Sequence, residues 1–193
     1  MKIHSPWDDR LEEPLAREHL VQLYRDDRLL VEAVALFAGR GLAKGEAVIL
    51  VATPAHLGAV EERLKDRGFD VEGPRQWGQL RVMDAETLLA RFMVEGRPDP
   101  ARFGSILSET ISAARAAGRY RKVRVYGEMV NLLWKENHAA ARMLEELWNG
   151  AIQAHSVSLL CGYGLDADAE AEERFPHDLR ELHSHLIPVI AGG

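Results

Sequence analysis

Five side chains that can bind a polar ligand end or directly follow five apolar runs of the sequence: Tyr24, Thr53, Asp84, Glu128 and Tyr163. Phenols and hydroxyls can donate and accept hydrogen bonds with a ligand, and carboxylates can accept them. Parallel strands place their carboxyl ends along one edge of a sheet, which is where open α/β sheets bind ligands. With apolar walls from Trp134 and Met129, such a site would suit a small, partly polar organic molecule. We expect its main members to be Tyr24, Glu128, Trp134 and Tyr163.

Glu128 has the most informative position of these residues. The run Val123–Tyr126 alternates as a buried strand does, Gly127 ends it, and a helical pattern begins at Met129. A carboxylate there can bind a ligand, or it can simply stabilise the amino terminus of the helix. The tyrosines and Trp134 have a similar alternative, because aromatic side chains at these spacings often pack in a core. Both interpretations stay open at the level of sequence.

Four residues could assist such a site: His19, Arg124, Cys161 and His183. His19 begins the strand that Tyr24 ends, so it should lie toward the opposite edge of the sheet. Arg124 lies within a strand and could pair with Asp84 or Glu128, either as a structural ion pair or as part of the site. Cys161 lies in an apolar strand, which predicts a small buried residue rather than a nucleophile.

The histidines near the end of the sequence show no recognised metal-binding spacing. His183 and His185 are two residues apart, so on a helix they would point to different faces. His177 and Asp178 do not complete a pattern such as H-E-x-x-H. The sequence therefore predicts no metal site and no cofactor.

Apolar strands alternate with amphipathic helices along most of the sequence. We expect strands at residues 19–24, 47–52, 80–85, 122–126 and 157–163. We expect helices at 29–38, where Gly39 and Gly41 should end the helix, and at 54–67, 86–94, 103–117, 129–134, 138–155 and 178–185. This order predicts a three-layer α/β fold, with a mainly parallel sheet of at least five strands and helices on both faces. Residues 1–16 would form a mobile or packed-down arm, and residues 17–193 a single domain.

Composition narrows the possible functions. The sequence has 193 residues, is 47% hydrophobic and carries a net charge of −6 without a basic stripe, so direct nucleic-acid binding is not expected. A single cysteine excludes an internal disulfide and fits a reducing cytoplasm. No apolar run is long enough to span a membrane, and no signal peptide is visible. We expect a cytoplasmic protein without membrane contact.

The order of elements near the start is similar to the nucleotide-binding core of RecA/KaiC-like ATPases. Those proteins carry a glycine-rich phosphate loop with a lysine after the first strand. Here the corresponding turn is Tyr24–Leu29, which contains no glycine or lysine and has two aspartates that would repel a phosphate. ATP hydrolysis is not expected.

A narrower resemblance rests on the block Val123–Val130, which contains the run Arg-Val-Tyr-Gly-Glu-Met-Val. Short pieces elsewhere in residues 17 to 190 add to it. These pieces are His19 with Tyr24, Phe37–Leu42 before Gly45-Glu46, Leu133-Trp134, Leu147–Asn149, Leu159–Tyr163 and His183-Ser184. Together they resemble the MEDS sensory domain family. The resemblance implies a RecA-related fold that lost its phosphate loop and serves prokaryotic signal transduction, sensing small hydrocarbon derivatives. The implied partners are a histidine kinase, an anti-sigma-type regulator or a transcriptional regulator, acting in trans because no output domain is attached.

Three functions follow from these observations. The first is a non-catalytic, ligand-responsive signalling domain with its pocket at the strand ends. The second is a protein-interaction module derived from a degenerate ATPase, which would present a large exposed apolar patch. The third is an enzyme that uses Glu128 as a base with Cys161 or a histidine, which would require these groups within hydrogen-bonding reach beside an open cleft.

Overall fold

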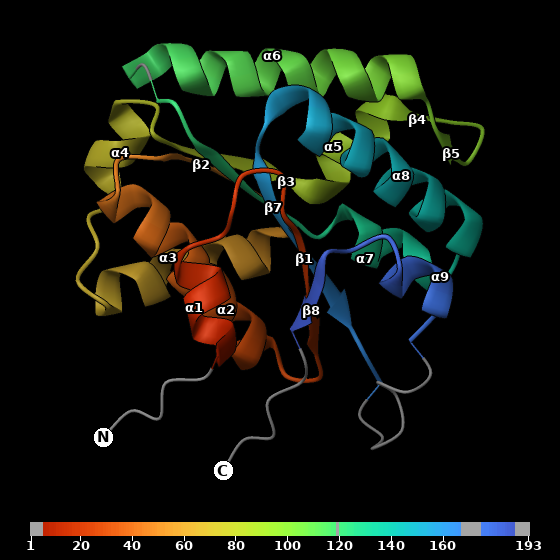
Figure 1. Cartoon of the computed structure of the whole chain (residues 1–193), viewed down its shortest axis with the longest axis horizontal. Coiled ribbons are helices and arrows are strands. Elements are labelled where there is room, and N and C mark those ends of the chain that lie inside the picture. Colours follow the sequence, from red (N-terminus) through yellow and green to blue (C-terminus); the bar gives the residue numbers. More distant parts are fainter. Residues whose placement is uncertain (1–5, 119, 167–174, 188–193) are drawn as a thin grey trace.

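The computed structural model describes residues 6–118, 120–166 and 175–187. Its centre is a sheet of six parallel strands in the order β3-β2-β6-β7-β1-β8 (Figure 1). The strands are β1 (His19–Tyr24), β2 (Ala47–Ala52), β3 (Leu80–Asp84), β6 (Val123–Gly127), β7 (Ser158–Gly164) and β8 (His185–Ile187). Every residue of β1, β2 and β6 is buried, as expected for central strands covered on both faces.

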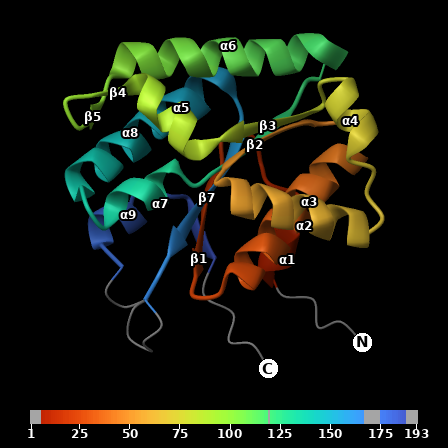
Figure 2. The same cartoon turned by 180° about the vertical axis from the view of Figure 1, so that it is seen from behind.

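Helices cover both faces of the sheet (Figure 2). One face packs against α1 (Pro6–Glu12), α2 (Asp27–Ala43) and α3 (Pro54–Asp66), with α4 (Glu72–Gln76) beside them. The other packs against α5 (Ala85–Phe92), α6 (Pro100–Gly118), α7 (Met129–Trp134), α8 (His138–His155) and α9 (His177–Arg180). A two-stranded hairpin, β4 (Met93–Val94) with β5 (Arg97–Pro98), joins α5 to α6. The expected three-layer α/β fold class is thus confirmed.

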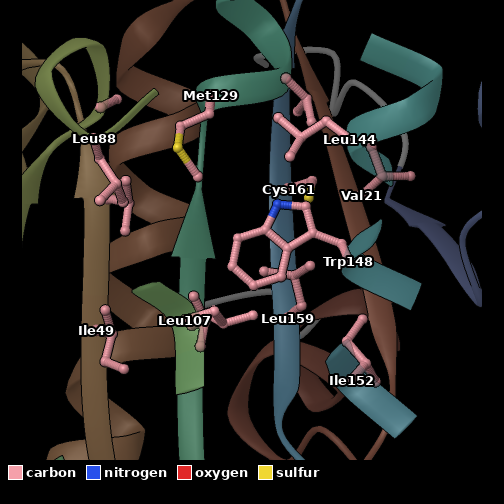
Figure 3. Close-up of a cluster of buried hydrophobic side chains, with 14 of the residues drawn as sticks. Val21, Ile49, Leu88, Leu107, Met129, Leu144, Trp148, Ile152, Leu159 and Cys161 are labelled. Atoms are coloured by element: carbon pink, nitrogen blue, oxygen red, sulfur yellow. The ribbon is translucent and has the colours of Figure 1, made fainter. Parts of the chain in front are cut away.

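The larger part of the core lies between the sheet and helices α5 to α8. Figure 3 shows Trp148 amid side chains from the strands and from all four of these helices. The Phe103 ring meets Trp148 edge-on at a centroid distance of 5.2 Å. Such edge-to-face packing adds to the free energy gained from burying the rings. None of the helices formed by the described residues combines the length and the apolar character that a membrane-spanning helix needs.

Two expectations about helices are wrong. Gly39 and Gly41 do not end α2, which continues to Ala43. A glycine inside a helix costs about 1 kcal/mol relative to alanine, but a Cβ on Gly39 would lie 2.4 Å from the Phe69 ring. Close packing thus explains that glycine. Residues 178–185 do not form one helix, because α9 ends at Arg180 and His185–Ile187 pair with β1 as the edge strand β8.

The amino-terminal segment adopts the packed-down alternative over its described part. Leu11 of α1 is 3% exposed and joins the core formed with α2. Arg124 holds this segment in place by donating hydrogen bonds to the carbonyls of Leu11 and Glu12 at 3.0 Å.

Arg124 does not pair with Asp84 or Glu128, so that expectation is wrong. Its guanidinium makes a buried ion pair with Glu46. The reason is its place in the strand. Arg124 is the second residue of β6, near the amino edge of the sheet, whereas the other two carboxylates lie at the carboxyl edge.

Candidate functional site

Glu128 lies in a buried polar cluster at the carboxyl edge of the sheet. Its carboxylate accepts hydrogen bonds from the Thr53 amide at 2.5 Å, from His56 Nδ1 at 2.7 Å and from the Tyr126 hydroxyl at 3.1 Å. The Tyr24 ring meets the His56 ring edge-on at 6.2 Å. Tyr24, His56, Tyr126 and Glu128 are called the Glu128 cluster below. Only 1% of Glu128 is exposed.

The protonation states in this cluster follow from its contacts. The hydrogen bond to Glu128 raises the pKa of His56, although partial burial opposes the shift. Burial favours a higher pKa for Glu128, but the hydrogen bonds from His56 and Thr53 outweigh it and the pKa is lowered. Burial and the nearby carboxylate raise the pKa of both Tyr24 and Tyr126. These shifts favour an imidazolium–carboxylate pair beside two neutral phenols.

His56 connects this cluster to the surface. A depression of about 450 Å³ lies between α2 and α3, and the partly exposed His56 forms part of its wall. Asp27 stands beside it, with Oδ1 3.5 Å from His56 Nε2. The remaining lining residues are Arg28, Val31, Glu32, Ala55, Ala59, Glu62, Arg63 and Asp66.

Asn131 extends the polar contacts along the carboxyl edge. Its side-chain amide donates to the Tyr24 hydroxyl at 3.3 Å, and its oxygen accepts from Trp134 Nε1 at 3.2 Å and from the Gly164 amide at 2.8 Å. The Trp134 ring packs against the Tyr163 ring with a centroid distance of 5.9 Å. Three of the four residues expected to form one pocket, Tyr24, Trp134 and Tyr163, are therefore linked in a row through Asn131, although the Tyr163 hydroxyl itself reaches Glu145 on the other face.

A second buried cluster surrounds Glu145 of α8 on the opposite face of the sheet. The Nε2 atoms of His19 and His183 lie 3.3 Å and 3.2 Å from its two carboxylate oxygens. The Tyr163 hydroxyl donates to Oε1 at 2.5 Å, and Cys161 Sγ lies 3.8 Å from Oε2. His19, Glu145, Cys161 and His183 are called the Glu145 cluster below. Each offers a possible metal-ligating atom, and these four atoms lie within 4.8 Å of one another.

Burial is the largest cause of the pKa shifts around Glu145, although for Glu145 itself it is outweighed. It lowers the pKa of His19, which the neighbouring His183 lowers further. It raises the pKa of the Cys161 thiol and the Tyr163 phenol, and the negative charge of Glu145 adds to both shifts. For Glu145 itself, burial would raise the pKa, but the two histidines outweigh it and the pKa is lowered.

The residues singled out from the sequence thus separate into groups. Tyr24 and Glu128 belong to one cluster, while His19, Cys161, His183 and Tyr163 belong around Glu145. Thr53 and Asp84 cap helices: Thr53 Oγ1 accepts from the His56 amide and Asp84 Oδ1 from the Thr87 amide. Their side chains therefore have local structural partners.

Sequence reasoning missed His56, Asn131 and Glu145. His56 follows a strand by a few residues in the first turn of a helix, which was a usable signal of position at the carboxyl edge. Glu145 lies on the buried stripe of α8 with Ala141, Leu144 and Trp148. A charged residue at a core position of a helical pattern indicates a buried partner.

The chain matches the model of a known protein family. The model of the MEDS family, the MEthanogen/methylotroph, DcmR Sensory domain, matches residues 18–185. The chain belongs to the MEDS family. The matched region contains every strand of the main sheet except the end of β8, and it includes both the Glu128 cluster and the Glu145 cluster. Comparison with curated proteins finds no match.

Proposed function

We propose that this MEDS domain is a non-catalytic sensor that binds a small organic molecule beside His56, at the carboxyl edge of the sheet. The observation that carries the proposal is the pairing of buried Glu128 with the partly exposed His56, whose imidazole borders an open depression. Buried charge held next to an accessible concavity is typical of binding sites. Membership of a sensory family supports the same conclusion.

The lining of the depression indicates the class of ligand. Val31, Ala55 and Ala59 provide short apolar side chains between the charged residues. His56 can donate from Nε2 while Nδ1 stays with Glu128. A molecule with a short hydrocarbon body and one oxygen acceptor fits these groups, in keeping with a small hydrocarbon derivative.

Transmission of the signal would use the polar row along the carboxyl edge. A ligand that draws His56 away from Glu128 changes the charge next to Tyr126 and, through Tyr24, the hydrogen bonds of Asn131. Asn131 in turn holds Trp134 and Gly164. The outer surface near α7 and β7 is then the surface that a separate cytoplasmic partner would read, whether a histidine kinase, an anti-sigma-type protein or a transcriptional regulator.

Nucleotide hydrolysis is not part of the proposal. The turn that would form a phosphate loop carries Asp26, whose carboxylate caps α2 by accepting from the Arg28 amide at 2.9 Å. Asp27 adds a second negative charge at the mouth of the depression. A degenerate phosphate loop of this kind disfavours a bound anion.

The alternative is an interaction module with no ligand of its own. Among the described residues, the exposed large apolar side chains are Leu15, Trp77 and Val94. They come from separate segments of the chain, so they do not by themselves indicate one apolar docking face.

Ligand binding can be tested by thermal unfolding against small alcohols, halocarbons, organic acids and nucleotides. A ligand of the folded state raises the melting temperature by mass action. We expect a small organic compound to raise it in the wild type and in Glu109→Gln, a change on the exposed face of α6. The shift should be lost in His56→Gln and Glu128→Gln.

Three results would contradict the proposal. A shift that survives in both site variants would place the ligand elsewhere. A shift with nucleotides alone would favour nucleotide binding of the kind found in RecA-like ATPases. If no compound of the panel changes the melting temperature while the domain still binds a regulator, the interaction module would be favoured.

A further inference from the structure

The Glu145 cluster has the spacing of a metal site. Two ligands at the usual distances from a tetrahedral zinc ion lie about 3.3 to 3.6 Å apart. In the protein, His19 Nε2 is 3.3 Å from Glu145 Oε2 and 3.3 Å from Cys161 Sγ, and His183 Nε2 is 3.2 Å from Glu145 Oε1. The carboxylate and thiol are 3.8 Å apart. These distances are close to the edges of a coordination tetrahedron, and because the four ligand atoms all lie within 4.8 Å of one another, a small inward movement of the wider-spaced atoms would complete it.

The second ring nitrogens of both histidines are already engaged. His183 Nδ1 lies 2.8 Å from the Leu179 carbonyl, which can only accept, so that nitrogen carries the proton. His19 Nδ1 lies 3.0 Å from the Asn149 side-chain oxygen, which is oriented because the Asn149 amide donates to the Leu182 carbonyl. In the neutral rings, both Nε2 lone pairs therefore point into the cluster. This is the outer-shell arrangement that orients metal-binding histidines.

One inward-facing atom of the cluster has no hydrogen-bond partner. His183 Nε2 is buried and makes no hydrogen bond, although it lies close to Glu145. Two neutral imidazoles would present lone pairs to a carboxylate that is fully buried. A cation among these atoms would remove the repulsion.

We infer that His19, Glu145, Cys161 and His183 bind a divalent transition-metal ion, of which zinc fits best. Imidazole, thiolate and carboxylate form a mixed donor set that suits zinc rather than magnesium or calcium. The charges also balance, since one thiolate, one carboxylate and two neutral imidazoles neutralise a divalent ion. Binding forms four coordinate bonds and releases the Cys161 thiol proton, with any proton held by the imidazoles, to solvent.

The site would be a closed structural one. Four protein ligands leave no open position of the kind that catalytic zinc sites keep for water. The ligands come from β1, α8, β7 and the segment between α9 and β8. A bound ion would therefore fasten the carboxy-terminal segment to the sheet. This inference is independent of the ligand site at His56, which lies on the other face.

The chain's single cysteine allows a spectroscopic test. Cobalt is added to chelator-treated full-length protein as a visible probe for the zinc site. We expect one equivalent to bind and to produce tetrahedral d–d bands together with a thiolate-to-cobalt charge-transfer band. Cys161 is the sole cysteine, so that band can arise only there within the chain. Zinc should displace the cobalt and bleach both sets of bands.

Matched variants separate the cluster from other histidines. His183→Asn and Glu145→Gln should weaken cobalt and zinc binding by more than about tenfold, the lower end of the effect of losing an outer-shell partner. Cys161→Ser should lose the charge-transfer band. His177→Asn, at an exposed histidine nearby, should bind as the wild type does.

The wild-type protein alone can refute the inference, so a variant that fails to fold does not prevent a decision. Folded wild type that binds neither cobalt nor zinc, or binds cobalt without the charge-transfer band, overturns it. Unchanged affinity in folded His183→Asn and Glu145→Gln also overturns it.

Discussion

The buried guanidinium of Arg124 donates hydrogen bonds to backbone carbonyls and also pairs with Glu46. It donates to the carbonyls of Leu11, Glu12 and Phe37 and pairs with the Glu46 carboxylate. Arg124→Met keeps the apolar stem but leaves these acceptors unsatisfied. We expect a loss of about 3 to 5 kcal/mol in the free energy of unfolding, the usual effect of removing one partner of a buried pair.

Urea unfolding measures this effect against a matched control. Arg142 makes an exposed pair with Glu146 on one helix, so Arg142→Met should cost less than about 1 kcal/mol. Equal losses in the two variants would contradict the structural role assigned to the buried contacts of Arg124.

His56 should make stability depend on pH in a defined direction. Its pKa in the folded protein is raised by Glu128. The pair's contribution is thus fully present below the unfolded value of about 6.5 and is lost as the pH rises through the raised folded pKa. On the acid side, Glu128 has a lowered pKa. Its contribution is present above about pH 4.3 and is lost as the pH falls through the folded pKa.

The measurement is urea unfolding of wild type and His56→Gln from about pH 5 to about pH 9. The difference in free energy of unfolding should be largest near the acid end and shrink as the pH rises. His177→Gln, at an exposed histidine, should follow the wild type. A difference that stays constant with pH would contradict a charged His56 in the folded protein.

At the level of elements, α2 and α6 provide two helical glycines in opposite surroundings. A Cβ on Gly39 of α2 would lie 2.4 Å from the Phe69 ring, whereas a Cβ on Gly104 of α6 would meet nothing within 4 Å. Gly39→Ala should therefore cost about 1 to 3 kcal/mol through overpacking. Gly104→Ala should stabilise by about 0.4 to 1 kcal/mol, because it restricts the unfolded chain. Thermal or urea unfolding of the two variants measures both effects. If Gly39→Ala stabilised the protein, the Phe69 ring would have to move aside at little cost, which would contradict the prediction.

The strands could be predicted because each long apolar run is buried on both faces. β1 and β2 begin and end where the sequence predicts, at His19–Tyr24 and Ala47–Ala52. β8 could not be predicted, since three residues carry no period and their strand conformation depends on pairing with β1. The glycine at position 39, inside α2, is likewise explained only by a tertiary contact, with Phe69.

The site was partly predictable for the same reason. The position of Glu128 after β6 follows from the end of an apolar run, and its burial with Tyr24 follows from the parallel sheet. The convergence of His19, Cys161 and His183 was not predictable, because it depends on the pairing of β1 with β7 and on the path of the segment between α9 and β8. The spacing of the histidines along the chain does not indicate that these residues come together. Tyr163 belongs to the opposite face from Tyr24 because alternate residues of a strand point to opposite faces.

For the whole molecule, the two edges of the sheet should respond differently to metal removal. β8 at one edge pairs with β1 through three residues, and it begins two residues after the proposed ligand His183. β3 at the other edge pairs with β2 through five residues and has no ligand of the Glu145 cluster near it in sequence. If an ion fastens the carboxy-terminal segment to the sheet, its loss should loosen the β8 edge and leave the β3 edge unchanged.

Hydrogen exchange of zinc-loaded and chelator-treated protein measures both edges at once. We expect amide protection in β8 and in the facing part of β1 to fall by about tenfold or more after chelation, corresponding to at least about 1.4 kcal/mol of local opening free energy. Protection in β2 and β3 should stay the same and serves as the internal control. The His183→Asn variant should show the loosened β8 edge with or without zinc. A uniform loss across both edges would instead mean that chelation destabilises the fold as a whole, and no loss at β8 would mean that the short edge strand is held by its packing alone.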